Sequence, residues 1–283
     1  MAGPGAERRE APEAVSEGEI TALIHLLDDP DLEVQASVHA RLRELPPAAE
    51  PLLAAASAGS PPPLQAALSQ VLRQPRFERL LHAWLQVLAQ PEINLEDAVF
   101  LLARYGNPDL DEAPYRALLD HLAGQVKPRI AAATGSQRAL LLSSFFCDDL
   151  GFAGNEQDYY DARNSYLDWV LDHRRGLPIT LSVIILLLGK RLDLPLYGIN
   201  MPAHFLVMYR EDASVLFIDL FHGGTFLTRK DCEGFLERAG ISVQDSYFEP
   251  TTTPAILQRM IRNLLSHADP PAALELAQLL RAI

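Results

Sequence analysis

The sequence predicts an α+β fold, in which an all-helical N-terminal region precedes a domain with one antiparallel sheet. Three observations predict it. Apolar residues recur at helical spacing through most of residues 17–150. A largely apolar helix then occupies residues 179–192, and three short apolar runs follow it. Because these strands succeed one another without further helices between them, the order is that of an α+β domain and not of a βαβ fold.

The N-terminal region begins after a tail. Residues 1–16 have no periodic apolar pattern, so we expect them to be disordered. From Glu17 the pattern is helical, and Asp28-Asp-Pro30 ends the first helix before a second one. The pair resembles one HEAT-type repeat, with residues 51–72 as a degenerate second copy, and we assign residues 17–75 to this region. A plain helical hairpin is the alternative.

Residues 76–150 are predicted to form a second helical segment. Asn94 is a candidate N-cap, with Asp97 three positions later in a capping-box-like arrangement. Tyr115 to Leu122 marks the next helix, and Leu140 to Leu150 marks another that contains Cys147. The apolar and acidic neighbours of Cys147 predict a buried, unreactive thiol.

The composition changes after Leu150, where we place a domain of residues 151–250. A loop and a short helix over Asn164–Leu171 precede the buried helix. Strands are expected over three ranges: Leu196–Asn200, His204–Tyr209 and Val215–Leu220. In residues 251–283, Pro254 opens a final helical pair that resembles the start of a tetratricopeptide repeat.

The net charge of the chain restricts the kinds of partner that it can bind. The 283 residues carry a formal net charge of −13. A nucleic-acid binder would present a basic face, and an acidic membrane surface would repel this chain. We therefore expect a protein or peptide partner, with neither nucleic acid nor membrane. Two cysteines, no signal-peptide pattern and no apolar run long enough to span a bilayer favour a cytoplasmic protein.

Thr180, His204 and Asp219 follow one another in the order of a papain-like catalytic site. Such a site places a nucleophile at a helix N-terminus, where the helix dipole and an imidazole activate it, and a carboxylate orients that imidazole. Here the helix start offers the hydroxyls of Thr180 and Ser182 but no thiol. An alcohol ionises far less readily than a thiol, so catalysis would need a well-placed base.

Longer motifs carry a resemblance to a known family. They are Asn164-Ser-Tyr-Leu167, Arg174-Arg-Gly-Leu-Pro-Ile-Thr-Leu-Ser182, Pro202-Ala-His-Phe-Leu206 and Ile218-Asp-Leu-Phe-His-Gly-Gly224. Together they resemble the bacterial SirB-type family, which has a transglutaminase-like, papain-like domain. The resemblance covers about residues 77–265. It implies His204 and Asp219 as counterparts of the transglutaminase-type His and Asp, with a nucleophile slot that holds no cysteine in the family either.

The chain departs from this family at three positions. Ala203 stands where the family usually has Gly, and Leu220 and His222 replace a Pro and an Asn. These departures put a shared ligand-binding geometry in doubt.

The first functional hypothesis is a non-catalytic binding or scaffold protein. In it, a cleft around His204 and Asp219 holds a peptide or a small polar ligand. Five further residues are candidates for ligand binding: Asn164, Arg174, Arg175, Ser182 and His222. Arginines with a neighbouring amide can recognise a carboxylate or a peptide backbone. A capping Asn and solvated arginines are the structural alternative.

Two other hypotheses use the same residues. One is a hydrolase or acyl-transfer enzyme in which Thr180 or Ser182 acts with His204 and Asp219, and it requires a hydroxyl within hydrogen-bond reach of the imidazole. If Thr180 instead caps its helix, that requirement fails. The other is a metal site formed by His204, Asp219 and His222. We expect no cofactor and no metal, and the oligomeric state stays open.

Overall fold

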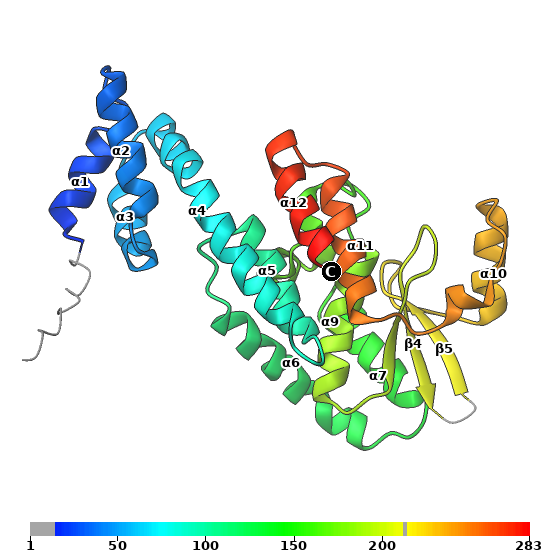
Figure 1. Cartoon of the computed structure of the whole chain (residues 1–283). Coiled ribbons are helices and arrows are strands. Elements are labelled where there is room, and N and C mark those ends of the chain that lie inside the picture. The colour runs from blue at the N-terminus through cyan, green and yellow to red at the C-terminus, as the bar shows by residue number, and fades with distance from the viewer. Residues whose placement is uncertain (1–14, 212–213) are drawn as a thin grey trace, which may run out of the picture. The chain divides into compact units, whose positions relative to one another are not determined.

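The computed structural model describes residues 15–211 and 214–283, and it divides the chain into two compact units, Met1–Arg79 and Leu80–Ile283 (Figure 1). Most of the predicted disordered tail, residues 1–14, lies outside the described residues. Ser16, at the end of that predicted tail, is ordered and serves as the N-cap of the first helix, because its side chain accepts a hydrogen bond from the backbone N–H of Glu19.

The first unit is a set of short helices around an aliphatic core. Its elements are α1 (Glu17–His25), α2 (Leu32–Glu44), the 3₁₀ turn η1 (Pro47–Ala49), α3 (Glu50–Ser57) and the first part of α4 (Pro62–Leu88). Ile20, Leu42, Leu53 and Leu72 from the four helices are all buried in one cluster. The interpretation of these helices as HEAT-type repeats stays a prediction.

Helix α4 crosses the domain boundary that the sequence suggested between residues 75 and 76. The helix continues through Pro75, and the contacts divide the chain after Arg79 instead. Helical periodicity holds on both sides of the proline, so the change of unit occurs without a change of secondary structure.

The second unit surrounds helix α9 (Pro178–Arg191). Eleven of its residues are buried, among them Thr180, Ser182 and Ile184. Helices on the N-terminal side of α9 in the chain are α5 (Leu95–Gly106), α6 (Ala113–Ala131), α7 (Gln137–Ser144) with the π-helical turn η2 (Phe145–Asp149), and α8 (Leu167–His173). Asn94 caps α5 as predicted, through the N–H of Glu96. Helix α9 is apolar on nearly every side, so it is buried at the centre of the core.

A four-stranded antiparallel sheet packs beside α9, with the order β3-β4-β5-β6 (Figure 1). The strands are β3 (Leu196–Ile199), β4 (Leu206–Glu211), β5 (Ser214–Asp219) and β6 (Thr225–Leu227). Met208 pairs with Phe217 on the face that meets α10 (Arg229–Arg238). Val207 pairs with Ile218 on the opposite face, because side chains alternate along a strand.

Two sequence expectations for the sheet need correction. The strand expected to start at His204 begins at Leu206, because the chain turns at Ala203, which has a φ of 60°. Strand β6 was not expected, since three residues after a glycine pair carry too short a pattern to stand out. It pairs Thr225 with Asp219 and so closes the end of β5.

The remaining elements are short or helical. A two-stranded parallel pair joins β1 (Ala153–Gly154) to β2 (Arg175–Gly176), and the 3₁₀ turn η3 (Ala162–Ser165) precedes α8. After α10 come the 3₁₀ turn η4 (Asp245–Phe248) and the helical pair α11 (Thr253–Leu265) and α12 (Pro270–Ala282). Trp84, in the last part of α4, is fully buried and donates its indole N–H to the carbonyl of Leu279 at 3.1 Å.

The α+β class is confirmed: helices precede and follow one small antiparallel sheet. Among the described helices, none combines the length and the apolar character that crossing a bilayer requires.

Candidate functional site

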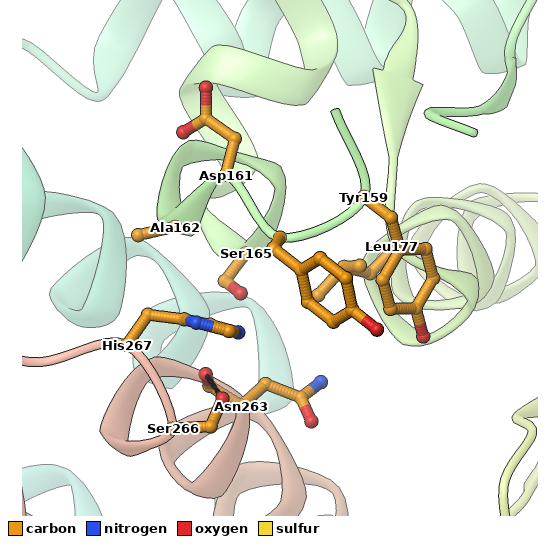
Figure 2. Close-up of a pocket in the computed structure, with 9 residues that line it drawn as sticks. Tyr159, Asp161, Ala162, Ser165, Leu177, Asn263, Ser266 and His267 are labelled. Carbon is orange, nitrogen blue, oxygen red and sulfur yellow. Dashed lines mark hydrogen bonds between the residues drawn. The ribbon is translucent and has the colours of Figure 1, made fainter. Parts of the chain in front are cut away.

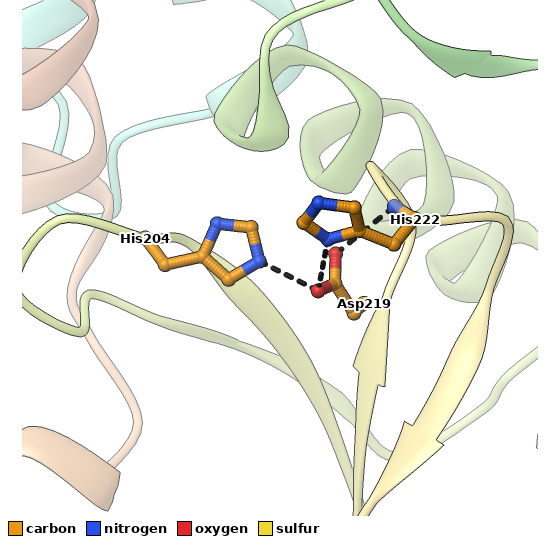
Figure 3. Close-up of side chains that lie close together, drawn as sticks. All are labelled: His204, Asp219 and His222. Atoms are coloured by element: carbon orange, nitrogen blue, oxygen red, sulfur yellow. Dashed lines mark hydrogen bonds and ion pairs between the residues drawn. The ribbon is translucent and has the colours of Figure 1, made fainter. Parts of the chain in front are cut away.

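Asp219, the last residue of β5, holds two imidazoles with one carboxylate oxygen. Its Oδ2 lies 2.8 Å from Nε2 of His204 and 2.7 Å from Nδ1 of His222 (Figure 3). The carboxylate and the His204 ring are buried, whereas the side chain of His222 is 56% exposed. The structure therefore brings together the predicted His204 and Asp219, and it adds His222 to them.

His204 reaches this carboxylate from the turn between β3 and β4. Its backbone N–H donates to the carbonyl of Met201, and its ring lies 5.7 Å from the ring of Phe235 on α10. The contact with Asp219 is close but poorly aligned as a hydrogen bond, because Nε2 of His204 has no hydrogen-bond partner among the described residues. A buried ring nitrogen without a partner is unusual in folded proteins.

His222 is placed by the tight turn that follows β5. Its backbone N–H donates to Oδ1 of Asp219 at 3.2 Å, and the N–H of Gly224 donates to the Asp219 carbonyl at 2.8 Å. Gly224 has a φ of 73°, and a Cβ there would lie 2.3 Å from Oγ of Ser143. Only glycine fits this position without displacement, so the turn that presents His222 depends on it.

Asp219 is a carboxylate at neutral pH. Burial raises its pKa, but the contacts with His204 and His222 outweigh burial and leave the pKa below its usual value. An anionic oxygen between two imidazoles can hold a shared proton or a cation.

Among the described residues, no hydrogen bond joins Thr180 or Ser182 of the nucleophile slot to His204. Thr180 is fully buried and its hydroxyl has no hydrogen-bond partner in the described part of the chain. The expectation that Thr180 caps α9 is wrong, because the N-cap residue is Leu177 and no side chain caps this end. Ser182 is also buried and donates to the carbonyl of Pro178 at 2.7 Å, four residues back along the helix. That bond satisfies its hydroxyl inside the core.

Cys147 lies near the site but is not an activated thiol. Burial, followed by the charge of Asp148, raises its pKa to about 11. The thiol is half-buried in the π-helical turn, and its Sγ lies 3.0 Å from where a Cβ on Gly224 would be. It is therefore protonated at neutral pH, in agreement with the expected lack of reactivity.

Three of the predicted ligand-binding residues, Asn164, Arg174 and Arg175, donate hydrogen bonds to backbone carbonyls of the chain itself. Asn164 is fully buried, and its amide group donates to the carbonyls of Asp158 and Tyr159 while its oxygen accepts from Asn155. It caps no helix, because the N-cap of η3 is Asp161. Asn164 thus fixes the course of the loop over residues 155–160.

The two arginines hold the neighbouring loop. Arg174 donates to the carbonyl of Leu150 at 2.7 Å, and Arg175 donates to the carbonyl of Gly151 at 2.7 Å. Among the described residues, no hydrogen bond or ion pair joins Asn164, Ser182 or either arginine to His204 or Asp219. Their predicted role as ligand-binding residues has no support in these contacts.

A line of aromatic rings leads from His222 to a small cavity. Phe221 lies 5.2 Å from the ring of His222 and 5.7 Å from the ring of Tyr159, and Tyr159 lies 5.3 Å from Tyr160. Tyr160 is 74% exposed and lies 5.4 Å from the ring of His267. The bare Cα of Gly154 makes room for the Phe221 ring, since a Cβ there would lie 2.5 Å from it.

The cavity has a volume of about 110 Å³ and lies between the 159–165 segment and the C-terminal end of α11 (Figure 2). Its lining combines aromatic rings with short polar side chains: Tyr159, Tyr160, Asp161, Ala162, Ser165, Leu177, Asn263, Ser266 and His267. A cavity of this size and polarity holds several water molecules or one small side chain.

Sequence reasoning missed the aromatic side of this site. Tyr159 and Tyr160 stand inside the motif Asp158-Tyr-Tyr-Asp161, so two adjacent tyrosines between acidic residues were the available signal. Asn263, Ser266 and His267 gave none, because they lie about 100 residues away and only the fold brings α11 to the loop.

Residues 113–262 match the family model described as the transglutaminase-like superfamily. The chain is 34% identical over 199 residues to a UPF0162 protein of Xylella fastidiosa, an alignment that covers 66% of this chain and 70% of that protein. A UPF0162 protein of Haemophilus influenzae is 28% identical over 172 residues, covering 55% and 64%. The F-box only protein 21 of Homo sapiens is 30% identical over 226 residues, covering 69% of this chain and 35% of that protein. No solved structure gives a significant match.

Proposed function

Since this chain belongs to the transglutaminase-like superfamily, we propose that it is a non-catalytic binding protein, a pseudoenzyme of the SirB type. Its ligand is a peptide segment of a partner protein. The SirB-type assignment rests on motifs that lie inside the matched residues 113–262. The proposal includes a cytoplasmic location. It is supported by the two cysteines, which form no disulfide bond.

One observation carries the non-catalytic half of the proposal. No hydroxyl or thiol of the described residues is bonded to the His204 ring, and the hydroxyl in the nucleophile slot, that of Thr180, is buried without a partner. A nucleophile must lie within hydrogen-bond reach of its base. Asp219 divides its contacts between two imidazoles, so it orients no nucleophile–imidazole pair.

The binding half of the proposal rests on the surface between His222 and the cavity. His222 and Tyr160 are exposed, and Phe221 and Tyr159 join them through ring contacts. Exposed aromatic side chains beside a polar cavity favour peptide recognition, because rings supply contact area while the cavity receives one side chain.

Other parts of the chain offer further contact surfaces under this proposal. The helices of the first unit and the pair α11–α12 would dock larger partners, as HEAT-type and tetratricopeptide-like helices do.

Peptide display against the immobilised protein tests the binding half. We expect selected peptides to lose about 5-fold in affinity on Tyr160→Ala, because a desolvated aromatic contact contributes roughly 1 kcal/mol. Thr180→Val is the matched control, since it changes a buried hydroxyl on the same domain and leaves the surface intact. Affinities equal for wild type, Tyr160→Ala and His222→Ala would overturn the proposed surface.

A hydrolysis assay tests the alternative, an acyl-transfer enzyme or hydrolase using Thr180 or Ser182. An activated ester and a glutamine-containing peptide serve as substrates. We expect the same low turnover for wild type, Thr180→Val and Ser182→Ala. Turnover that either substitution abolishes in a folded protein would establish the enzyme and refute the non-catalytic proposal.

A further inference from the structure

We propose that His204, Asp219 and His222 bind a divalent first-row metal ion, with Zn²⁺ as the test ion. The three side chains each offer one donor atom, and these atoms all lie within 4.8 Å of one another (Figure 3). Two imidazoles and one carboxylate are a ligand set that divalent iron and zinc use in proteins. The sequence expectation was that no metal binds here, and the geometry points the other way.

The second observation is the poorly aligned contact that the His204 ring nitrogen makes with Asp219. The His204 side chain is 93% buried, since 7% of its surface is exposed. Its Nε2 faces Asp219 and His222 but makes no hydrogen bond of acceptable geometry with the described residues. A buried polar atom without a well-aligned hydrogen bond is unfavourable. A metal ion between the three donors would satisfy it.

The two distances to Asp219 require only a small adjustment, and the two imidazole nitrogens, which lie within 4.8 Å of each other, must approach to about 3.3 Å. Two contacts to Asp219 measure 2.8 Å and 2.7 Å. Donors around a tetrahedral zinc ion lie about 3.3 Å apart, since each bond is roughly 2.0–2.1 Å long. The two imidazoles must therefore move away from the carboxylate by about half an ångström each. The exposed His222, at the end of a turn, can move without disturbing the core.

The surroundings suit a cation. The chain as a whole carries a net charge of −13, so its field attracts cations. The backbone N–H of His222 donates to Oδ1 of Asp219, which leaves Oδ2 oriented toward the two rings. Hydrogen bonds of this kind orient metal ligands in known sites. Three protein ligands leave at least one coordination position for water.

Metal binding is independent of the peptide-binding proposal, although it uses His222 from the same surface. Occupancy is measured on the protein alone, without a peptide. A protein that binds Zn²⁺ and no peptide would refute only the proposed function. A protein that binds peptides and no metal would refute only the present inference.

The experiment is titration of the full-length protein, first stripped with a chelator, with Zn²⁺ by calorimetry and with Co²⁺ by visible absorption. We expect one ion per chain, a Co²⁺ spectrum typical of four or five ligands, and a raised Tm. His222→Ala should lower the affinity at least about 100-fold, because loss of a direct ligand exceeds the 10–100-fold effect of a neighbouring contact. Its exposure makes a folded variant the expected result.

Two further variants complete the test. Asp219→Asn keeps the shape of the carboxylate and removes its charge, so affinity should fall. His121→Ala, which changes an exposed histidine outside both the cluster and the cavity, is the matched control and should bind as wild type does. Equal affinity for His222→Ala and His121→Ala would mean adventitious surface binding only and would overturn the inference. The inference would also be overturned if the wild type showed no saturable binding of Zn²⁺ up to about 1 mM, a concentration that corresponds to weak binding.

Discussion

Asp219 determines the character of the site at the scale of single residues. In a catalytic arrangement, the carboxylate orients one imidazole and leaves the far nitrogen of that ring for a nucleophile. Here the same oxygen, Oδ2, contacts both His204 and His222. His222 stands where the resembling family usually has an asparagine, so one substitution supplies the second imidazole. The Asp219 carboxylate therefore gathers two imidazole nitrogens around one anionic oxygen.

Cys147 provides a residue-scale prediction about thiol chemistry. Burial and the charge of Asp148 raise its pKa to about 11, from an ordinary value of 9.0. A raised thiol pKa means that the neutral form persists through the physiological range, and the thiolate fraction at pH 7.5 falls about 100-fold. We expect iodoacetamide to modify Cys147 about 100-fold more slowly than a peptide thiol at pH 7.5, with the rate rising up to about pH 11.

Peptide mapping by mass spectrometry separates Cys147 from Cys232, whose pKa burial also raises to about 11. Reduced glutathione in the same tube is the reference thiol. Rapid labelling of Cys147 at pH 7.5 would show an activated thiol beside the Asp219 turn, and thiol catalysis would have to be reconsidered.

At the scale of elements, the loop over residues 155–160 depends on one buried side chain. Asn164 donates to the carbonyls of Asp158 and Tyr159 and accepts from Asn155. We expect Asn164→Ala to lower the free energy of unfolding by about 2–3 kcal/mol, because two carbonyls lose their donor in a buried setting. The measurement is urea unfolding at equilibrium.

The neighbouring Asn155→Ala is the matched control for this loop. Its side chain loses the bond to Asn164 and one further bond, to the N–H of Asp158, near the surface. It should therefore lower the free energy of unfolding by only about 1 kcal/mol. Equal losses of unfolding free energy for the two variants would contradict the assignment of Asn164 as the anchor of the loop.

The same substitution should also weaken peptide binding. We expect selected peptides to bind Asn164→Ala more weakly, because Tyr159 and Tyr160 lose their fixed positions.

The elements also show which features a sequence discloses. The apolar pattern predicted α9 and β3 to β5 within about two residues, because a buried helix and buried strands leave continuous apolar runs in the sequence. The two-residue pair β1–β2 and the strand β6 leave none, since their pairing is decided by distant neighbours. The burial of Thr180 likewise follows from what surrounds the start of α9. A helix-start hydroxyl looks the same in sequence whether it caps, reacts or is enclosed.

The residues of the candidate site were likewise predictable only in part. His204 and Asp219 were predictable because a fixed order of helix and strands brings them together. His222 was named as a candidate, yet its contact with Oδ2 depends on a glycine turn after β5. Asn164 and the arginines were assigned to a ligand because polar side chains near motifs suggest contacts with one. The structure shows those side chains bonded to backbone carbonyls.

At the scale of the whole molecule, the chain passes from one compact unit to the other within the continuous helix α4. The two halves of that helix serve different cores. Leu68 and Leu72 belong to the cluster of the first unit, whereas Trp84 is fully buried in the second and bonds to Leu279 of α12. The residues 113–262 that match the superfamily model lie wholly inside the second unit. The site and its support are therefore expected to be independent of the first unit.

A fragment of residues 80–283 tests this independence. We expect it to unfold in one cooperative transition and to keep the blue-shifted tryptophan emission of a buried indole, because Trp84 retains its bond to Leu279. It should also retain the metal affinity of the full chain, since all three donor residues are present. A fragment of residues 91–283 is the control. Without Trp84 it should be less stable by about 3–5 kcal/mol, the usual effect of removing a large buried aromatic side chain. If the longer fragment lacks a cooperative transition, residues before Leu80 are part of the folding unit of the site, and the division of the chain after Arg79 does not describe its stability.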